Sequence, residues 1–207
     1  MMNRFYSRLT GIVIILGLLI SAGCISGTTA PSSFYVLNPI TDAKKETPQI
    51  SEKETILIGV GNIELPNYLD RPQIVTRITN NKLKLGEFDM WAENLSDSFP
   101  VILADNLSNL LSDQPVAIIP GVGVMQVDYR VKVDVTRMDG TLGGDAILIA
   151  RWGIFGDQGK LLETSRSVYR KPTKGDGYEA YVAAHSDAIA SLSRNIAAAI
   201  ETLLKER

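Results

Sequence analysis

The chain has very little of what enzymes commonly use for chemistry. Its 207 residues include one cysteine and one histidine. A single cysteine excludes an internal disulfide, and a single histidine excludes metal sites built on histidine pairs. The formal net charge is only −2, and there is no basic run that would follow a phosphate backbone. We therefore expect no catalytic set, no metal site, no cofactor and no nucleic-acid partner.

Two glycine pairs and three carboxylates are the remaining candidates for chemistry. Gly59-Val60-Gly61 and Gly121-Val122-Gly123 lack the spacing of phosphate-binding loops, and neither opens a convincing helix. We interpret them as bulges or turns. Asp128, Asp134 and Glu163 fall in strand patterns, where solvated side chains are the expected outcome rather than a paired acid and base.

The first 23 residues differ in composition from the rest and predict a signal peptide. Arg4 and Arg8 form a positive region, residues 11–20 (GIVIILGLLI) are uninterruptedly apolar, and Ser21-Ala22-Gly23 supplies small residues for cleavage. An apolar run of this length is short for a bilayer span, which needs about 20 residues. The alternative is an uncleaved signal anchor.

The only cysteine follows these small residues directly. Leu19-Ile20-Ser21-Ala22-Gly23-Cys24 resembles a bacterial lipobox, which predicts that Cys24 is acylated. The alternative is an unmodified thiol at a signal-peptide junction. Two or three acyl chains anchor a protein firmly, whereas one holds only reversibly. Ile25 replaces the aspartate that retains lipoproteins at the inner membrane, so we expect the periplasmic face of the outer membrane.

Behind the cysteine we expect a lipidated, flexible tether over residues 24–33 and one globular domain over residues 34–207. The tether is short, rich in small residues and has little to bury. Within the domain, residues 41–54 are polar and are predicted to form a loop. Strands are predicted over the following segments: 33–37, 55–63, 73–79, 82–85, 126–138, 146–155 and 161–169.

Two helices are predicted from apolar residues at helical spacing. The first lies between Trp91 and Leu111 and contains Pro100, which either bends one helix or marks the start of a shorter one. The last is expected to start at an Asp176 N-cap and to run for about 28 residues. His185 lies near its apolar stripe, which favours a packed helix residue over a catalytic base.

Together these elements predict an α+β fold. We expect a small antiparallel or mixed sheet, built around a meander of three to four strands, with two helices packed on one face and a long C-terminal helix. The pattern is clearest in residues 126–138, where Val131, Val133 and Val135 alternate with charged residues.

The most specific string of the domain is Tyr68-Leu69-Asp70-Arg71-Pro72-Gln73-Ile74-Val75, a turn that enters a strand. Trp91-Ala92-Glu93 and Leu95 follow, where the first helix is expected to begin. With the lipobox and the first strand Phe34-Tyr35-Val36-Leu37, these motifs resemble the PqiC-like lipoproteins, the ABC-type transport auxiliary lipoproteins. The resemblance covers nearly all of the mature chain.

This resemblance implies an auxiliary component of an MCE-type intermembrane lipid transport system. The implied partners are a periplasmic MCE-domain protein, through it an inner-membrane permease, the outer membrane through the lipid anchor, and further copies of the chain in a ring. Our candidate partner contacts are Tyr68, Asp70, Arg71 and Trp91; their alternative role is to fix a turn and fill the core. Two other functions stay open: a periplasmic lipid-binding module, and a structural envelope lipoprotein without a role in transport.

Overall fold

The longest strand patterns of the sequence form three adjacent strands of a five-stranded sheet. The computed structural model describes residues 30–41, 55–123 and 125–206. Strands β6 (Tyr129–Gly140), β7 (Asp145–Phe155) and β8 (Leu161–Pro172) make an antiparallel meander. The predicted meander is thus confirmed in these three strands, and the turn before β8 has Gly159 at φ +75°, a value that glycine adopts without steric cost.

Two parallel strands extend this sheet on the side of β6. Strand β2 (Ile56–Glu64) pairs with β6, and β5 (Val116–Pro120) pairs with β2, which gives the order β5-β2-β6-β7-β8. The sheet is therefore mixed. The sequence did not predict β5, because its five residues show no alternation of apolar and polar side chains.

The other three strands form a separate sheet. Strands β3 (Gln73–Thr79) and β4 (Lys82–Trp91) make an antiparallel hairpin at the predicted strands 73–79 and 82–85, and β1 (Ser33–Tyr35) lies parallel to β4. The expectation that Trp91 opens the first helix was wrong, because β4 continues to this residue. Trp91 stays in the strand because its N–H donates a hydrogen bond to the Pro72 carbonyl at 2.7 Å.

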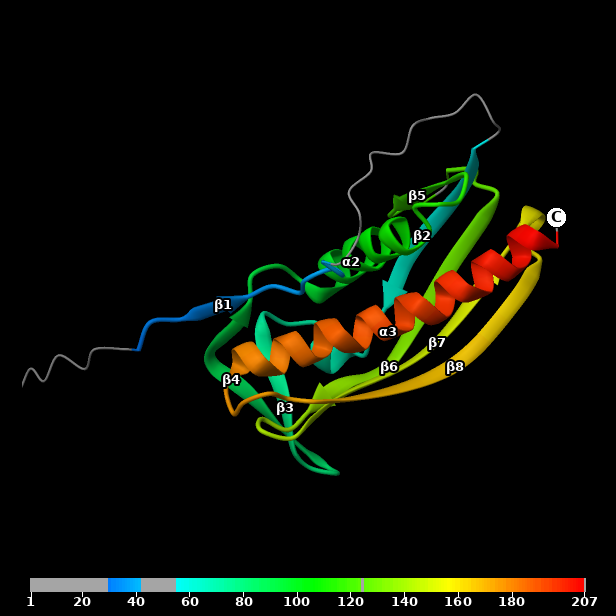
Figure 1. Cartoon of the computed structure of the whole chain (residues 1–207). Coiled ribbons are helices and arrows are strands. Elements are labelled where there is room, and N and C mark those ends of the chain that lie inside the picture. Colours follow the sequence, from blue (N-terminus) through cyan, green and yellow to red (C-terminus); the bar gives the residue numbers. More distant parts are fainter. Residues whose placement is uncertain (1–29, 42–54, 124, 207) are drawn as a thin grey trace, which may run out of the picture. The chain divides into compact units, whose positions relative to one another are not determined.

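The two helices pack over one face of the five-stranded sheet (Figure 1). Helix α2 (Leu95–Leu110) contains Pro100 in its second turn, so the alternative of a helix that starts at this proline was wrong. Helix α3 (Tyr178–Lys205) has 28 residues, as expected. Neither described helix has the length and hydropathy that a bilayer span requires. The predicted α+β class is confirmed, with the long C-terminal helix.

The start of α3 differs from the prediction. Its N-cap is Gly177, with no side-chain hydrogen bond to the helix, so the predicted Asp176 cap was wrong. A side chain at Gly143 would collide with the Asp176 carboxylate. Asp176 therefore packs against the β6–β7 turn, which prevents it from reaching the first N–H groups of the helix.

The core lies between the sheet and the helices and follows the predicted alternation. Val131, Val133 and Val135 of β6 are buried against the helices. The apolar stripe of α3 is likewise buried from Val182 to Ile200, and Leu203 at its end is half-buried. One buried polar contact joins the two helices: the Asn106 side-chain amide donates to Ser193 Oγ at 3.0 Å.

The two glycine pairs of the sequence meet in the structure. The N–H of Gly121 donates to the Val60 carbonyl at 2.9 Å. Val122 is buried against Gly59, where a Cβ would lie 2.6 Å from its side chain. Gly121 and Gly123 both have positive φ, which favours glycine. Close packing and a turn thus account for both pairs, as the sequence analysis expected.

The signal peptide, Cys24 and most of the tether fall in residues 1–29, and most of the expected loop falls in residues 42–54. These segments lie outside the described residues. Residues Ser32–Arg207 form one compact unit.

Candidate functional site

The Tyr68–Val75 motif forms a short 3-10 helix and a strand start. Helix η1 (Asn67–Leu69) follows Pro66, whose carbonyl accepts a hydrogen bond from the Leu69 N–H at 2.9 Å. The Asp70 N–H donates to the Asn67 carbonyl at 3.2 Å and the Arg71 N–H donates to the Leu69 carbonyl at 2.8 Å. Backbone bonds therefore fix the turn that the motif predicted, while the side chain of Asp70 is exposed.

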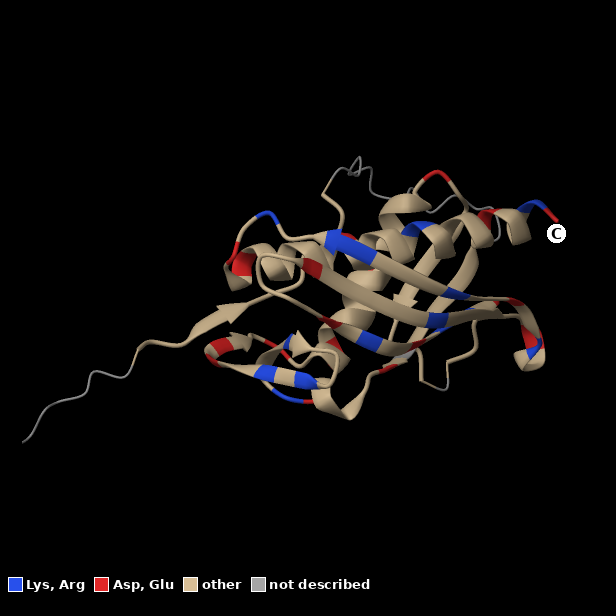
Figure 2. Ribbon diagram, turned by 90° about the horizontal axis from the view of Figure 1, so that it is seen from below, with Lys and Arg blue, Asp and Glu red and all other residues tan. Residues whose placement is uncertain are grey.

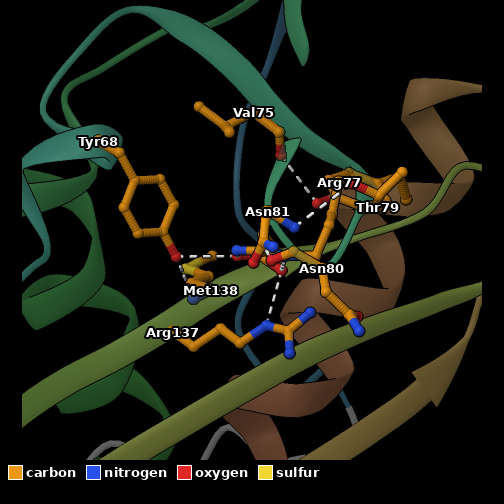
Figure 3. A network of polar contacts seen from close by, with 10 residues as sticks. Tyr68, Val75, Arg77, Thr79, Asn80, Asn81, Arg137 and Met138 are labelled. Carbon is orange, nitrogen blue, oxygen red and sulfur yellow. Dashed lines mark hydrogen bonds and ion pairs between the residues drawn. The ribbon is translucent and has the colours of Figure 1, made fainter. Parts of the chain in front are cut away.

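Tyr68 bonds from this turn to a buried carboxylate on β6, Asp139. Figure 3 shows Tyr68, Arg77 and Arg137 gathered around this place. Its hydroxyl donates to Asp139 Oδ2 at 3.0 Å and accepts from the Met138 N–H at 3.3 Å. Arg77 of β3 donates to both carboxylate oxygens, from Nε at 2.8 Å and from Nη2 at 2.6 Å. Arg137 Nε donates to Oδ1 at 2.7 Å. We call Tyr68, Arg77, Arg137 and Asp139 the carboxylate cluster.

The carboxylate cluster has the electrostatics of a paired buried charge. Asp139 is 0% exposed. Burial by itself raises the pKa of its carboxyl, but the hydrogen bonds from Arg77 and Arg137 outweigh burial and hold the pKa below its usual range. Burial, followed by the charge of Asp139, raises the pKa of Tyr68 to about 12. The carboxylate is thus ionised and fully engaged, which suits a structural link between the two sheets.

Trp91 lines a surface pocket between β1 and α2. The indole is 7% exposed and contributes to the core. The pocket has a volume of about 190 Å³ and is lined by Tyr35, Val36, Leu37, Trp91, Glu93, Ser98, Val101 and Ile102. Val36 and Val101 are among the large apolar side chains that are exposed. We call this feature the β1–α2 pocket.

The structure brings the two parts of the sequence motif together. The Pro72 carbonyl accepts a hydrogen bond from the N–H of Trp91. Arg71 therefore directly precedes the residue that pairs with Trp91, which lines the β1–α2 pocket. Arg71 is half-buried, and its Nε has no hydrogen-bond partner in the described part of the chain. Asp70 and Arg71 thus lie at the surface of the turn, whereas Tyr68 and Trp91 also make contacts in the interior.

Sequence reasoning missed Arg77, Arg137 and Asp139. The available signal was weak: Arg137-Met138-Asp139 interrupts the alternation of β6 at the point where a bulge shifts the register. We had expected the carboxylates of these strands to be solvated. Glu163 is exposed, as expected, whereas Asp134 is half-buried. Asp128 is exposed but precedes β6, and its Oδ2 accepts a hydrogen bond from the Leu57 N–H at 2.8 Å.

His185 is a packed helix residue, as the sequence analysis favoured. It is 1% exposed, and its ring meets that of Tyr181 edge to face at 4.6 Å between centroids. Its Nδ1 has no hydrogen-bond partner among the described residues. Burial lowers the pKa of His185 to about 4.

This buried imidazole should make stability depend on pH. The unfolded chain binds a proton near the ordinary histidine pKa of about 6.5, whereas the folded chain does so only near 4. The free energy of unfolding should therefore fall by about 3 kcal/mol as the pH drops from 6.5 to 4. Urea unfolding at a series of pH values measures it. His185→Gln, which cannot titrate, should flatten this slope; an unchanged slope would contradict the assignment.

Among the residues that the structure describes, no group of three His, Cys, Asp or Glu side chains could hold a metal ion. The site consists instead of a fixed turn, an internal ionic link and a small apolar pocket at the surface, a set suited to contact with another molecule.

Fold and site together define a single α+β domain with a fixed motif turn and a small surface pocket, and the comparisons with known proteins give its family. The family model for the ABC-type transport auxiliary lipoprotein component matches residues 35–197. The chain belongs to this family. It is 27% identical over 161 residues to the intermembrane transport lipoprotein PqiC of Escherichia coli K12, which covers 78% of this chain and 81% of that protein. The protein of the same name from Shigella flexneri matches equally.

Two crystal structures share the fold. An uncharacterized protein superimposes with a TM-score of 0.68 at 22% identity, over 83% of this chain and 99% of the other. A protein from Xanthomonas campestris has a TM-score of 0.63 at 15% identity, over 80% of this chain and 92% of the other. At these identities the likeness concerns the fold alone.

Proposed function

We propose that this protein is an outer-membrane lipoprotein that docks a periplasmic MCE-domain protein, as an auxiliary component of an intermembrane lipid transport system. The observation that carries the proposal is the family match over residues 35–197 together with the likeness to an intermembrane transport lipoprotein. The lipobox at Cys24, followed by Ile25, supports the outer membrane as the place of anchoring.

In this proposal the protein acts mechanically rather than chemically. Acylation of Cys24 fixes the chain to the membrane, and the tether of residues 24–33 sets its reach at about 30 Å, at most about 3.4 Å per residue. Confinement within this reach raises the effective concentration of the domain for a partner that spans the periplasm. An inner-membrane permease would be linked through that partner, and a ring of copies would multiply the contacts.

The docking surface we propose combines the motif turn with the β1–α2 pocket. Asp70 and Arg71 offer charged contacts, and the pocket offers an apolar recess beside Trp91, with Val101 exposed at 45%. Apolar recesses with a polar rim are typical anchoring points of protein interfaces. Tyr68 supports this surface from within through its bond to Asp139.

Co-purification with the MCE-domain protein tests this surface. Arg71→Ala should abolish capture of the partner and leave the melting temperature nearly unchanged, because Arg71 Nε has no hydrogen-bond partner among the described residues whose loss would destabilise the fold. Val101→Asp at the pocket should act likewise, since it places a charge in an apolar recess.

Lys174→Ala serves as the matched control, because Lys174 is an exposed cation in the loop before α3. Capture of the partner should survive this change. Full capture by both Arg71→Ala and Val101→Asp would exclude the surface. A loss of capture that parallels a loss of stability would assign Arg71 to the fold alone.

A further inference from the structure

The face of the five-stranded sheet that points away from the helices carries a group of arginines. Trp152 and Ala150 of β7 are buried against the helices, and side chains alternate along a strand. Arg151 and Ile149 therefore point to the other face. Arg151 pairs in register with Arg166 of β8, and Ile149 pairs with Val168. Arg170, two residues further along β8, shares the same face.

Two of these cations lack a counter-charge. Arg166 and Arg170 are exposed and make no ion pair within the described ranges. Among the described residues, Arg151 forms an ion pair with Asp134 alone, at 4.0 Å, with side chains 66% and 45% exposed, a contact that stabilises little. Like charges directly opposite each other on neighbouring strands are destabilising. A bound anion would therefore stabilise this pair of arginines by reducing the repulsion between them. Figure 2 shows basic positions on adjacent strands of this sheet.

Apolar surface lies between the cations. Val168 is 45% exposed, and it separates Arg166 from Arg170 on the edge strand β8. Its partner Ile149 is half-buried. We call Arg151, Arg166, Val168 and Arg170 the basic sheet face. Such a surface can place guanidinium groups on phosphates, which they bind in bidentate fashion, while the valine meets less polar material between them.

We propose that the basic sheet face binds the phosphate headgroups of anionic phospholipid. The chain belongs to a lipoprotein family, so an acylated copy meets lipid phosphate at a higher local concentration than other anions. Charge complementarity favours an anionic surface although the whole chain is slightly acidic, because the arginines are gathered on one face. The proposal is independent of the docking function, which uses the motif turn and the β1–α2 pocket.

Vesicle co-sedimentation tests the proposal on a chain that starts at Ile25. This chain lacks the acyl anchor and keeps the whole compact unit Ser32–Arg207. It should bind vesicles of phosphatidylglycerol and phosphatidylcholine and should not bind vesicles of phosphatidylcholine alone. The double variant Arg151→Gln/Arg166→Gln should bind the anionic vesicles at least about tenfold more weakly, and added salt should weaken binding of the parent chain.

The control is Arg194→Gln/Lys205→Gln, which removes two exposed cations from α3 and should leave binding unchanged. Circular dichroism and the melting temperature establish whether both double variants fold. Equal binding by the Arg151/Arg166 variant, or equal binding to both vesicle types, would overturn the proposal. Competition by inorganic phosphate at constant ionic strength would point instead to a site for free phosphate. Equally tight, arginine-dependent binding to polyglutamate would point to an acidic protein.

Discussion

Replacing Asp139 by alanine is expected to lower the free energy of unfolding by about 3–5 kcal/mol. The carboxylate is 0% exposed and accepts hydrogen bonds from Tyr68, Arg77 and Arg137. Removing it leaves two guanidinium groups and a hydroxyl without their acceptor in a partly buried place. Chemical unfolding followed by circular dichroism measures the loss.

Asp134→Ala is the matched control, because Asp134 lies on the same strand with a side chain 45% exposed and one contact at 4.0 Å. It should change stability by less than about 0.5 kcal/mol. Asp139→Asn keeps the shape without the charge and should fall between the two. If Asp139→Ala were no more harmful than Asp134→Ala, the carboxylate cluster would not link the two sheets.

The same cluster has a pH dependence that can be separated from that of His185. The pKa of Asp139 is lowered in the folded chain, so its contribution is present above the unfolded pKa of about 3.9. It is lost only as the pH falls through the folded value. The loss from His185 occurs earlier, between pH 6.5 and 4. Comparing the parent chain with His185→Gln above pH 4 and with Asp139→Asn below pH 4 therefore assigns each loss to its residue.

Trp91→Ala is expected to cost about 3–5 kcal/mol, the range for large aromatic side chains removed from a core. Trp91 is 7% exposed and packs in the main apolar cluster, so its removal leaves a cavity beneath the β1–α2 pocket. Val101→Ala, on the exposed side of the same pocket, should cost less than about 0.5 kcal/mol. Urea unfolding of the two variants gives the comparison.

This result matters for docking, because Trp91 is both a candidate contact and a core residue. Trp91→Phe refills most of the cavity and should recover most of the stability. If it also recovers capture of the MCE-domain partner, Trp91 acts by shaping the pocket. Stability unchanged in Trp91→Ala would instead assign the indole to the surface.

The sequence by itself determined the elements whose pattern is carried within one segment. The alternation of Val131, Val133 and Val135 predicted β6, and the stripe of α3 predicted a helix of the observed length. These patterns predict the elements correctly because each strand or helix buries one face, and the spacing of apolar residues along the chain shows which residues lie on that face. The family resemblance rested in the same way on continuous motifs such as Tyr68–Val75.

Only the tertiary structure decided which segments meet. Asp139 is bonded to Arg77 and Tyr68, which lie 62 and 71 positions away in the sequence, and nothing local to β6 indicates that its carboxylate is buried. Trp91 belongs to strand β4 because it pairs with Pro72 and Tyr35. Asp176 does not cap α3, because its side chain packs against the β6–β7 turn. Each outcome depends on contacts between distant segments, whose geometry is set by how the two sheets and two helices pack.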